Sequence, residues 1–183
     1  MIARAIALTL LIALAAPTWC FAAPAVPAAA KRMAKPAPKT ATAVFAGGCF
    51  WCLETQFETF PGVKSVVSGY TGGHKDRPTY EEVCAHTTGH YEAVRIVYDP
   101  TMVSYAQLLD RLWHGIDPTQ GDGQFCDIGE SYRSAIFWQD STQRSLALDS
   151  KRELERSGVL KSPIVTAIVP GKPFWPAEEY HRS

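Results

Sequence analysis

The run Gly47-Gly48-Cys49-Phe50-Trp51-Cys52 constrains this chain more than any other feature. A strand-like stretch at residues 43–46 runs into the two glycines, and the cysteine then opens a segment whose apolar side chains recur at helical spacing. At such a junction, backbone N–H groups and the positive end of the helix dipole converge on the thiol and favour its ionised form. We therefore expect Cys49 to be a thiolate nucleophile. The aromatic side chains of Phe50 and Trp51 indicate the walls of a small apolar pocket beside it.

Cys49 and Cys52 have the CxxC spacing that is typical of redox pairs. Positions i and i+3 share one face of a helix, so the two thiols are expected within disulfide reach. A product bound to the sulfur of Cys49 could then be displaced by Cys52. Two other interpretations stay open, a permanent structural disulfide and a zinc site. The further zinc ligands would be Cys84 and either His86 or His90.

The first 22 residues have the pattern of a secretory signal peptide. Arg4 precedes an apolar stretch at residues 5–16, and small residues then lead to a cleavage point after Ala22. The stretch is short for a membrane span, although an uncleaved anchor is the alternative. We expect export to the periplasm and no stable membrane association after cleavage. Residues 23–42 are rich in Ala, Pro and Lys and predict an extended linker, which leaves one domain at residues 43–183.

The net charge of zero conceals an asymmetry between the two parts of the chain. Five of the 18 basic residues precede residue 42, whereas none of the 18 acidic residues does, so the domain keeps 13 basic residues and a net charge of −5. An acidic domain without a basic stripe argues against a nucleic-acid partner. Neither a cofactor nor a metal is expected, and the domain is expected to be a monomer.

Cysteine usage allows two interpretations. Export implies an oxidising compartment, where cysteines normally form structural disulfides. After signal cleavage the chain keeps four cysteines, Cys49, Cys52, Cys84 and Cys126. A domain of this length and aromatic content does not need covalent staples, so redox chemistry is favoured over two permanent bridges.

Hydrophobic periodicity predicts an α+β fold. Expected strands are residues 44–47, 63–70, 91–98, 134–138 and 164–169, and expected helices are 49–60, 80–85, one capped by Ser104, and 141–156. This order predicts a two-layer α/β sandwich with a mixed sheet and a ferredoxin-like (split βαβ) core. Residues 117–131 read as a polar loop rich in Gly and Asp, of the kind that carries function on a rigid frame, although a solvated connector is the alternative.

A second chemical signal is the carboxylate of Glu92, which opens an otherwise apolar strand. Burial would raise its pKa and make it a proton donor at neutral pH. The alternative is an ordinary strand-edge residue paired with Arg95 or Arg133. Physical reasoning alone does not separate the two.

Together these runs resemble the A-type peptide-methionine sulfoxide reductases, which act on the S epimer of the sulfoxide. The resemblance covers residues 43–181 in one order. The matching runs are Gly48-Cys49-Phe50-Trp51, Gly69-Tyr70-Thr71-Gly72-Gly73, Pro78-Thr79-Tyr80-Glu81-Glu82-Val83-Cys84, Gly89-His90-Tyr91-Glu92-Ala93-Val94, Ser131-Tyr132-Arg133-Ser134-Ala135-Ile136, Asp117-Pro118-Thr119 and Phe174-Trp175-Pro176-Ala177-Glu178.

The resemblance implies a role for each matching residue. Cys49 would attack the sulfoxide sulfur, and Glu92 would protonate the sulfoxide oxygen. The remaining implied roles are hydroxyl donation to that oxygen by Tyr80 and Tyr132, a methyl pocket formed by Phe50 and Trp51, and ordering of the site by Asp127. The resulting sulfenic acid would condense with a second thiol, and a thioredoxin-like dithiol would then restore the enzyme.

Two departures from the family pattern concern recycling and the polar loop. Many members carry a recycling cysteine in a longer tail, whereas here no cysteine follows Cys126. Cys52 stands where many members have Gly, so Cys52 is the expected recycling residue, with Cys126 and Cys84 as alternatives. Ile128 stands where a basic residue is common. Rival functions are a thioredoxin-like disulfide oxidoreductase and a disulfide-bonded binding module.

Overall fold

The structure, a computed structural model, describes residues 40–181. The expected signal peptide and most of the expected linker lie outside these residues. Within residues 40–181, no helix combines the length and the apolar character that crossing a membrane requires.

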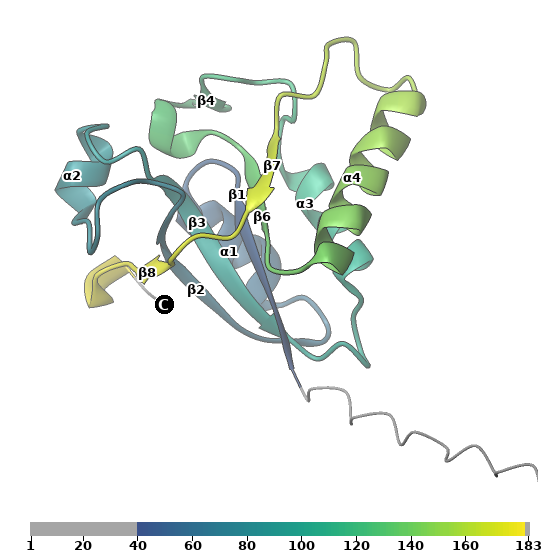
Figure 1. The fold of residues 1–183 in the computed structure, drawn as a ribbon, viewed down its shortest axis with the longest axis horizontal. Helices are drawn as coiled ribbons and strands as arrows, with labels where there is room; N and C mark the ends of the chain where they lie inside the picture. Colours follow the sequence, from purple (N-terminus) through teal and green to yellow (C-terminus); the bar gives the residue numbers. More distant parts are fainter. Residues whose placement is uncertain (1–39, 182–183) are drawn as a thin grey trace, which may run out of the picture. The chain divides into compact units, whose positions relative to one another are not determined.

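The described residues form one six-stranded mixed sheet in the order β7-β6-β1-β3-β2-β8, and β7 and β8 form its two edges (Figure 1). Every neighbouring pair is antiparallel except β6 and β7, which are parallel. The strands of the sheet are β1 (Ala41–Ala46), β2 (Val63–Thr71), β3 (Tyr91–Tyr98), β6 (Ala135–Trp138), β7 (Ala167–Pro170) and β8 (Trp175–Pro176). A separate hairpin pairs β4 (Gly123–Gln124) with β5 (Asp127–Ile128).

Within the described residues, four α-helices and one short 3₁₀ helix lie between strands, and a second 3₁₀ helix follows β8. They are α1 (Phe50–Glu58), α2 (Tyr80–Cys84), α3 (Tyr105–Gly115), α4 (Ser141–Arg156), η1 (Glu130–Tyr132) and η2 (Glu179–His181). Helix α3 begins at the expected place because Ser104 caps it, accepting a hydrogen bond from the N–H of Gln107. Helix α4 spans exactly the residues that periodicity predicted.

The central four strands confirm the ferredoxin-like prediction. Helix α1 connects β1 to β2, and β3 lies between those two strands; helix α3 then connects β3 to β6, with β1 between them. This is two interleaved split βαβ units. The arrangement places the start of α1 and the start of β3 at the same end of the sheet, because β1 and β3 are antiparallel and Ala46 pairs with Ala93.

The two faces of the sheet are covered differently. One face packs against α1, α3 and α4 in the main core, which contains Phe45, Phe57, Ile96 and Leu108 with many other buried side chains. The other face carries a smaller cluster that includes Phe137, and the chain that connects β7 to β8 crosses it with Phe174 (Figure 1). Glu92 shares the helix-covered face, since strand side chains alternate and Val94 and Ile96 belong to the main core.

Three parts of the fold differ from the sequence prediction. The last predicted strand begins only at Ala167, because the N–H groups of Val165 and Thr166 donate to the carbonyl of Pro118. The predicted polar loop contains the β4–β5 hairpin, and β8 was not predicted at all. Each of these three strands has two residues, too few to show any periodicity.

Gly48 joins β1 to α1 through a conformation that suits glycine. Its φ is +91°, and a Cβ there would lie 2.9 Å from Cβ of Gln124 in the hairpin. Gly158 provides a matched control, since its φ is +70° but a Cβ there would meet nothing within 4 Å.

We expect Gly158→Ala to lower the free energy of unfolding by about 1 kcal/mol, the cost of placing an L residue at positive φ. Gly48→Ala should cost about 3 kcal/mol, because the same strain is combined with a clash against the hairpin. Urea unfolding of both variants measures the difference. Equal destabilisation would show that the hairpin does not press on Gly48.

Candidate active site

Cys49 lies between the end of β1 and the first residue of α1, as the N-cap of the helix. Its carbonyl accepts hydrogen bonds from the N–H groups of Cys52 (3.1 Å) and Leu53 (3.3 Å), which fixes the first turn. The side chain is half-buried. The predicted strand–glycine–cysteine–helix junction is therefore present, with the helix beginning one residue later than expected.

The expectation that Cys49 is predominantly a thiolate is wrong for this structure. The backbone N–H groups of Trp51 and Cys52 do lower the pKa of the thiol, as the helix-start argument required. Burial is the larger effect, however, and it raises the pKa above its ordinary value, with the charge of Glu92 adding to the rise. The thiol thus keeps its proton until something in the site changes.

Glu92 is 1% exposed and lies directly opposite the start of α1. Its Oε2 accepts a hydrogen bond of 3.0 Å from the N–H of Phe50, the residue after Cys49. Burial raises the pKa of this carboxyl to about 7, against the lowering effect of that hydrogen bond, and nearby Asp127 raises it further. Near neutral pH, Glu92 is therefore divided between a proton donor and a carboxylate.

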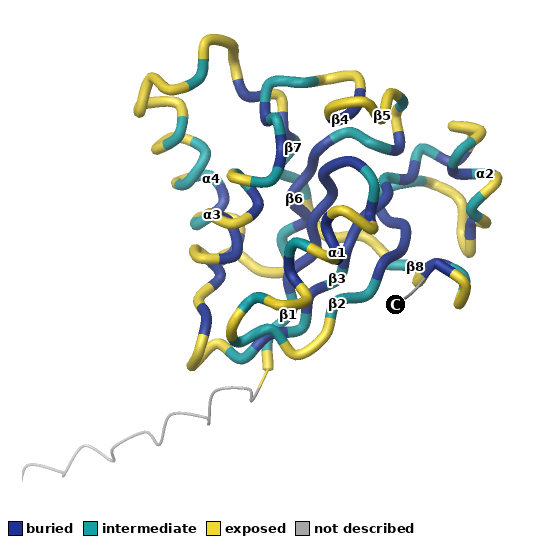
Figure 2. Tube along the Cα trace, turned by 180° about the vertical axis from the view of Figure 1, so that it is seen from behind, coloured by how far each residue is buried: buried dark blue, intermediate teal, exposed yellow. Residues whose placement is uncertain are grey.

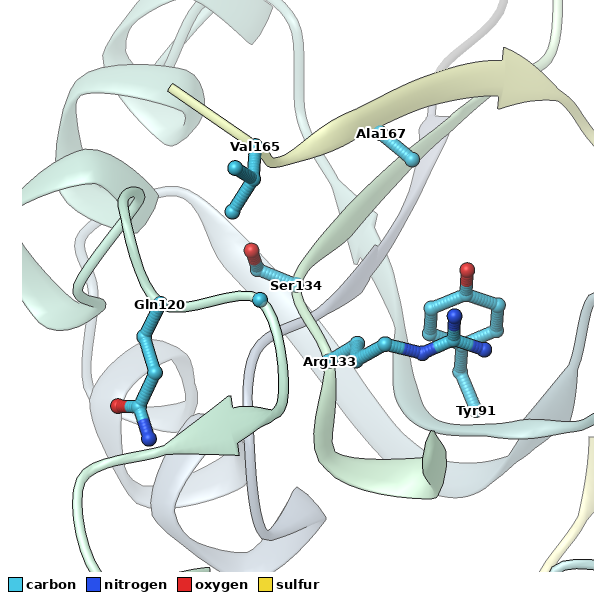
Figure 3. Close-up of a pocket in the computed structure, with 7 residues that line it drawn as sticks. Tyr91, Gln120, Arg133, Ser134, Val165 and Ala167 are labelled. Atoms are coloured by element: carbon cyan, nitrogen blue, oxygen red, sulfur yellow. The ribbon is translucent and has the colours of Figure 1, made fainter. Parts of the chain in front are cut away.

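The alternative in which an arginine neutralises Glu92 does not occur among the described residues. Arg95 instead stacks over Phe174, and Arg133 stacks over Tyr91 at 5.1 Å from the ring centre. Tyr91 and Arg133 line a separate pocket of about 170 Å³, together with Ser134, Val165 and other residues (Figure 3). Because side chains alternate along β3, the neighbour of Glu92 faces away from the thiol.

Two tyrosines and an aspartate lie around the same point. Tyr80, the first residue of α2, interacts electrostatically with both Cys49 and Glu92, and its hydroxyl donates a hydrogen bond to the sulfur of Cys84. This bond and burial raise the pKa of Tyr80 to about 12. Tyr132 in η1 lies near Glu92, Tyr80 and Asp127, and burial raises its pKa as well. Both phenols are therefore protonated hydrogen-bond donors at neutral pH.

The aromatic residues after Cys49 form part of a larger cluster. Phe50 is buried, with its ring 6.0 Å from Tyr70, whereas Trp51 is 47% exposed. Trp51 Nε1 donates a 2.8 Å hydrogen bond to the carbonyl of His181 at the end of the described chain. The ring of His181 packs at 5.7 Å from Phe50, 5.4 Å from Trp51 and 4.3 Å from Tyr80.

The remaining cysteines differ in position. All four cysteines within residues 40–181 are free thiols. Cys52 is exposed on α1, Cys126 is exposed in the turn between β4 and β5, and Cys84 is half-buried beneath Tyr80. The same part of the chain contains no cluster of three His, Cys, Asp or Glu side chains suited to holding a metal ion.

This site can be compared with those of known proteins. Residues 41–183 match the family model for peptide methionine sulfoxide reductase. The chain belongs to that family. This reductase is 56% identical over 146 residues to the peptide methionine sulfoxide reductase MsrA of Bacillus licheniformis. The alignment covers 80% of this chain and 81% of that protein. The corresponding protein of Bacillus subtilis is 54% identical over 144 residues, 79% of this chain and 81% of that protein.

Solved structures agree with this assignment. Methionine sulfoxide reductase A of Corynebacterium diphtheriae superposes with a TM-score of 0.69 at 34% identity, covering 80% of the reductase described here and 74% of that chain. Reduced Mxr1 of Saccharomyces cerevisiae gives 0.71 at 27% identity, with 79% and 83% covered. The predicted family and α+β fold are thus confirmed.

Sequence reasoning missed the part that the C-terminal segment of this reductase plays. Glu178 accepts two hydrogen bonds of 2.9 Å, one from the hydroxyl of Tyr70 and one from the N–H of Tyr80. It therefore links β2 to the start of α2 and holds Tyr80 over the thiol. The run at 174–178 was noted only as a family match, since no periodicity indicates where such a segment lies in space.

The pKa of Glu92 makes the stability of the reductase depend on pH. The pKa is raised from 4.5 to about 7 on folding, so the folded state favours the protonated form. Stability from this group is fully present below pH 4.5 and is lost as pH rises to 7, by about 3 kcal/mol. Glu92→Gln keeps the acceptor for Phe50 N–H but cannot ionise. We expect the variant to match wild type at pH 4.5 and to be more stable at pH 8, as measured by urea unfolding; a constant difference would contradict this pKa.

Proposed function

We propose that this reductase converts the S epimer of methionine sulfoxide, free or in proteins, to methionine and thereby repairs oxidised proteins. Membership of the family supports the reaction. One observation carries the proposed mechanism: the half-buried thiol of Cys49 lies beside the buried carboxyl of Glu92, whose pKa is about 7. The N–H of Phe50, the residue after Cys49, donates a hydrogen bond to that carboxyl.

In the first step, Cys49 attacks the sulfur of the sulfoxide. The attack forms a bond between the two sulfur atoms as the sulfoxide oxygen takes up a proton and its bond to the substrate sulfur breaks. The released oxygen then bonds to the sulfur of Cys49, the sulfur–sulfur bond breaks, and methionine leaves as the thioether, so that Cys49 is left as a sulfenic acid. The sulfoxide oxygen must gain its proton as the sulfur–oxygen bond weakens, and Glu92 supplies it. Tyr132 stabilises the developing charge with its protonated hydroxyl group, and Tyr80 does the same once its hydroxyl turns from the sulfur of Cys84 to the sulfoxide oxygen.

The raised pKa of Cys49 fits this scheme. The ionised form of Glu92 is one of the causes of the rise, so protonation of Glu92 removes that cause while the N–H groups of Trp51 and Cys52 still favour the thiolate. A sulfoxide oxygen that accepts a hydrogen bond from Glu92 stabilises its protonated form. Substrate binding therefore promotes ionisation of the thiol at the moment when a nucleophile is needed.

In the second step, a thiol condenses with the sulfenic acid to form a disulfide and water. We assign this role to Cys52, which is exposed one helical turn from Cys49. Cys84 is a weaker candidate because its sulfur is engaged by the hydroxyl of Tyr80, and Cys126 is exposed in the hairpin turn. Phe50 and Trp51 are assigned to the methyl group of the substrate, and Asp127 to ordering the site.

The disulfide is reduced by exchange with an external dithiol, which we infer to be thioredoxin-like. The exposure of Cys52 supports this, because a partner protein must reach the sulfur that it attacks. Yeast Mxr1 has itself been solved in complex with Trx2. We further infer from the signal-like pattern of residues 1–22 that the chain acts in the periplasm. We also infer that it acts as a monomer. Finding the protein in the cytosol after cell fractionation would remove the inference about the periplasm.

The first experiment measures turnover of each sulfoxide epimer with dithiothreitol for wild type, Cys49→Ser and Cys52→Ser. We expect only the S epimer to be reduced, and we expect Cys49→Ser to be inactive. Cys52→Ser should release about one methionine per enzyme at the normal rate and then turn over slowly with a thioredoxin-like donor, because its sulfenic acid lacks an internal partner. If Cys52→Ser instead turned over at the normal steady-state rate with the thioredoxin-like donor, Cys126 or Cys84 would be the recycling residue.

A second experiment separates the proton donor from the nucleophile. Glu92→Gln should lower sulfoxide reduction by about 10² to 10⁴-fold, the usual effect of losing a general acid. The same change should make Cys49 easier to ionise, because one cause of its raised pKa is removed. The pH profile of alkylation by iodoacetamide should therefore shift to lower pH. A disulfide oxidoreductase would show the second effect without the first.

A further inference from the structure

The mouth of the site is surrounded by large apolar side chains exposed to solvent. Residues 40–181 contain seven such side chains, and four of them lie on the three segments that adjoin the site: the first turn of α1, the β4–β5 hairpin and the C-terminal segment. The four are Trp51 at 47% exposed, Phe125 at 64%, Ile128 at 58% and Tyr180 at 70%. We call this set the apolar rim. Scattered single apolar residues are ordinary on protein surfaces, but a group around one opening indicates an interaction site.

One side of the apolar rim is the β4–β5 hairpin, which lies above α1 in Figure 2. The hairpin contacts the start of the helix, since Gln124 occupies the space beside Gly48. Phe125 has a φ of +52°, a costly conformation for a bulky residue, and its N–H donates a 2.7 Å hydrogen bond to Oε1 of Gln120. Such strain persists where the surroundings hold it, and it clusters at ligand sites. The phenyl ring on this strained backbone faces solvent.

The opposite side is the C-terminal segment, near the label C in Figure 2. Tyr180 packs against the ring of His181 at 4.3 Å, and that ring contacts Trp51 at 5.4 Å. Trp51 is tied to this segment by its hydrogen bond to the carbonyl of His181. These rings are therefore held in place and lose little conformational entropy on contact with a ligand.

Within the segments that carry the apolar rim, the charged side chains are acidic; Arg133, just after them, donates a hydrogen bond to the carbonyl of Glu130 and stacks over Tyr91. Asp127 and Glu130 flank the hairpin side, and Glu179 flanks the C-terminal side, all exposed. The segments that carry the rim, residues 50–58, 123–132 and 174–181, contain no Lys or Arg. An acidic group brought to the opening would meet these carboxylates without a cation in the same segments to offset them.

We infer that the apolar rim is a recognition surface for an extended polypeptide in which methionine sulfoxide has large apolar neighbours and no acidic ones. This inference rests on the proposed function, because the rim is continuous with the pocket of Cys49. Phe125 and Ile128 act as specificity-determining residues, since they contact the neighbours of the reacting side chain.

The test compares kcat/KM for three tripeptides, acetyl-X-methionine sulfoxide-X-amide with X as Leu, Lys or Glu. Each value is divided by that of a small reference substrate, N-acetylmethionine sulfoxide amide. For wild type we expect the Leu peptide to exceed the Glu peptide at least tenfold, with Lys between them. Burial of the leucine side chains against the apolar rim favours the Leu peptide, and repulsion by the carboxylates disfavours the Glu peptide.

Two rim variants and one matched control complete the test. Phe125→Asn preserves tolerance of the positive φ, and Ile128→Ser keeps an extended hairpin residue. Each should lower the Leu-to-reference ratio about threefold to tenfold. Val159→Ser removes a 72% exposed apolar side chain beyond the end of α4 and should leave every value unchanged.

The outcomes distinguish this inference from the proposed function. Equal ratios for the three peptides in wild type, or an unchanged Leu ratio in both rim variants, would overturn the recognition surface while reduction of the reference substrate continued. Failure to reduce the reference substrate itself would instead contradict the proposed function. Circular dichroism of each variant confirms that the fold is retained.

Discussion

The hydrogen bond from the N–H of Phe50 to Oε2 of Glu92 is the contact on which the site depends. It joins the first residue of α1 to the second residue of β3. The ferredoxin-like topology brings the starts of these two elements to the same end of the sheet. An otherwise apolar environment makes an ionised carboxyl there expensive. The fold thus raises the pKa of Glu92 to about 7 and places this carboxyl beside Cys49, where it can protonate the oxygen of a sulfoxide that the thiol attacks.

The thiol shows how competing effects are decided by magnitude. A cysteine at a helix start is expected to ionise, and the N–H groups of Trp51 and Cys52 do act in that direction. Half-burial beside Glu92 outweighs them and keeps the thiol protonated. In the scheme proposed above, the two acids of the site are coupled, because protonation of the carboxyl removes one of the causes that raise the pKa of the thiol.

The walls of the site come from parts of the chain that are distant in sequence. The hairpin at 123–128 presses on Gly48, and the segment ending at His181 closes over Trp51 and Tyr80. Local patterns predicted neither contact: a two-residue strand has no period, and Glu178 is one acid among several in a polar tail. The helix and strand boundaries that were predicted well, such as α4 and β3, are those with long periods or clear caps.

The sequence by itself determined the family, the α+β class, the strand–glycine–cysteine–helix junction and the candidate residues for the chemistry, because each follows from local spacing or from motifs read in order. Physical reasoning from the residues left open whether Glu92 was a paired surface residue or a buried acid, which only the family resemblance favoured, and it suggested the wrong ionisation state for Cys49. Only the tertiary structure decided those points. Burial and the sign of neighbouring charge depend on which distant residues surround a group, and no pattern along the chain specifies that surrounding.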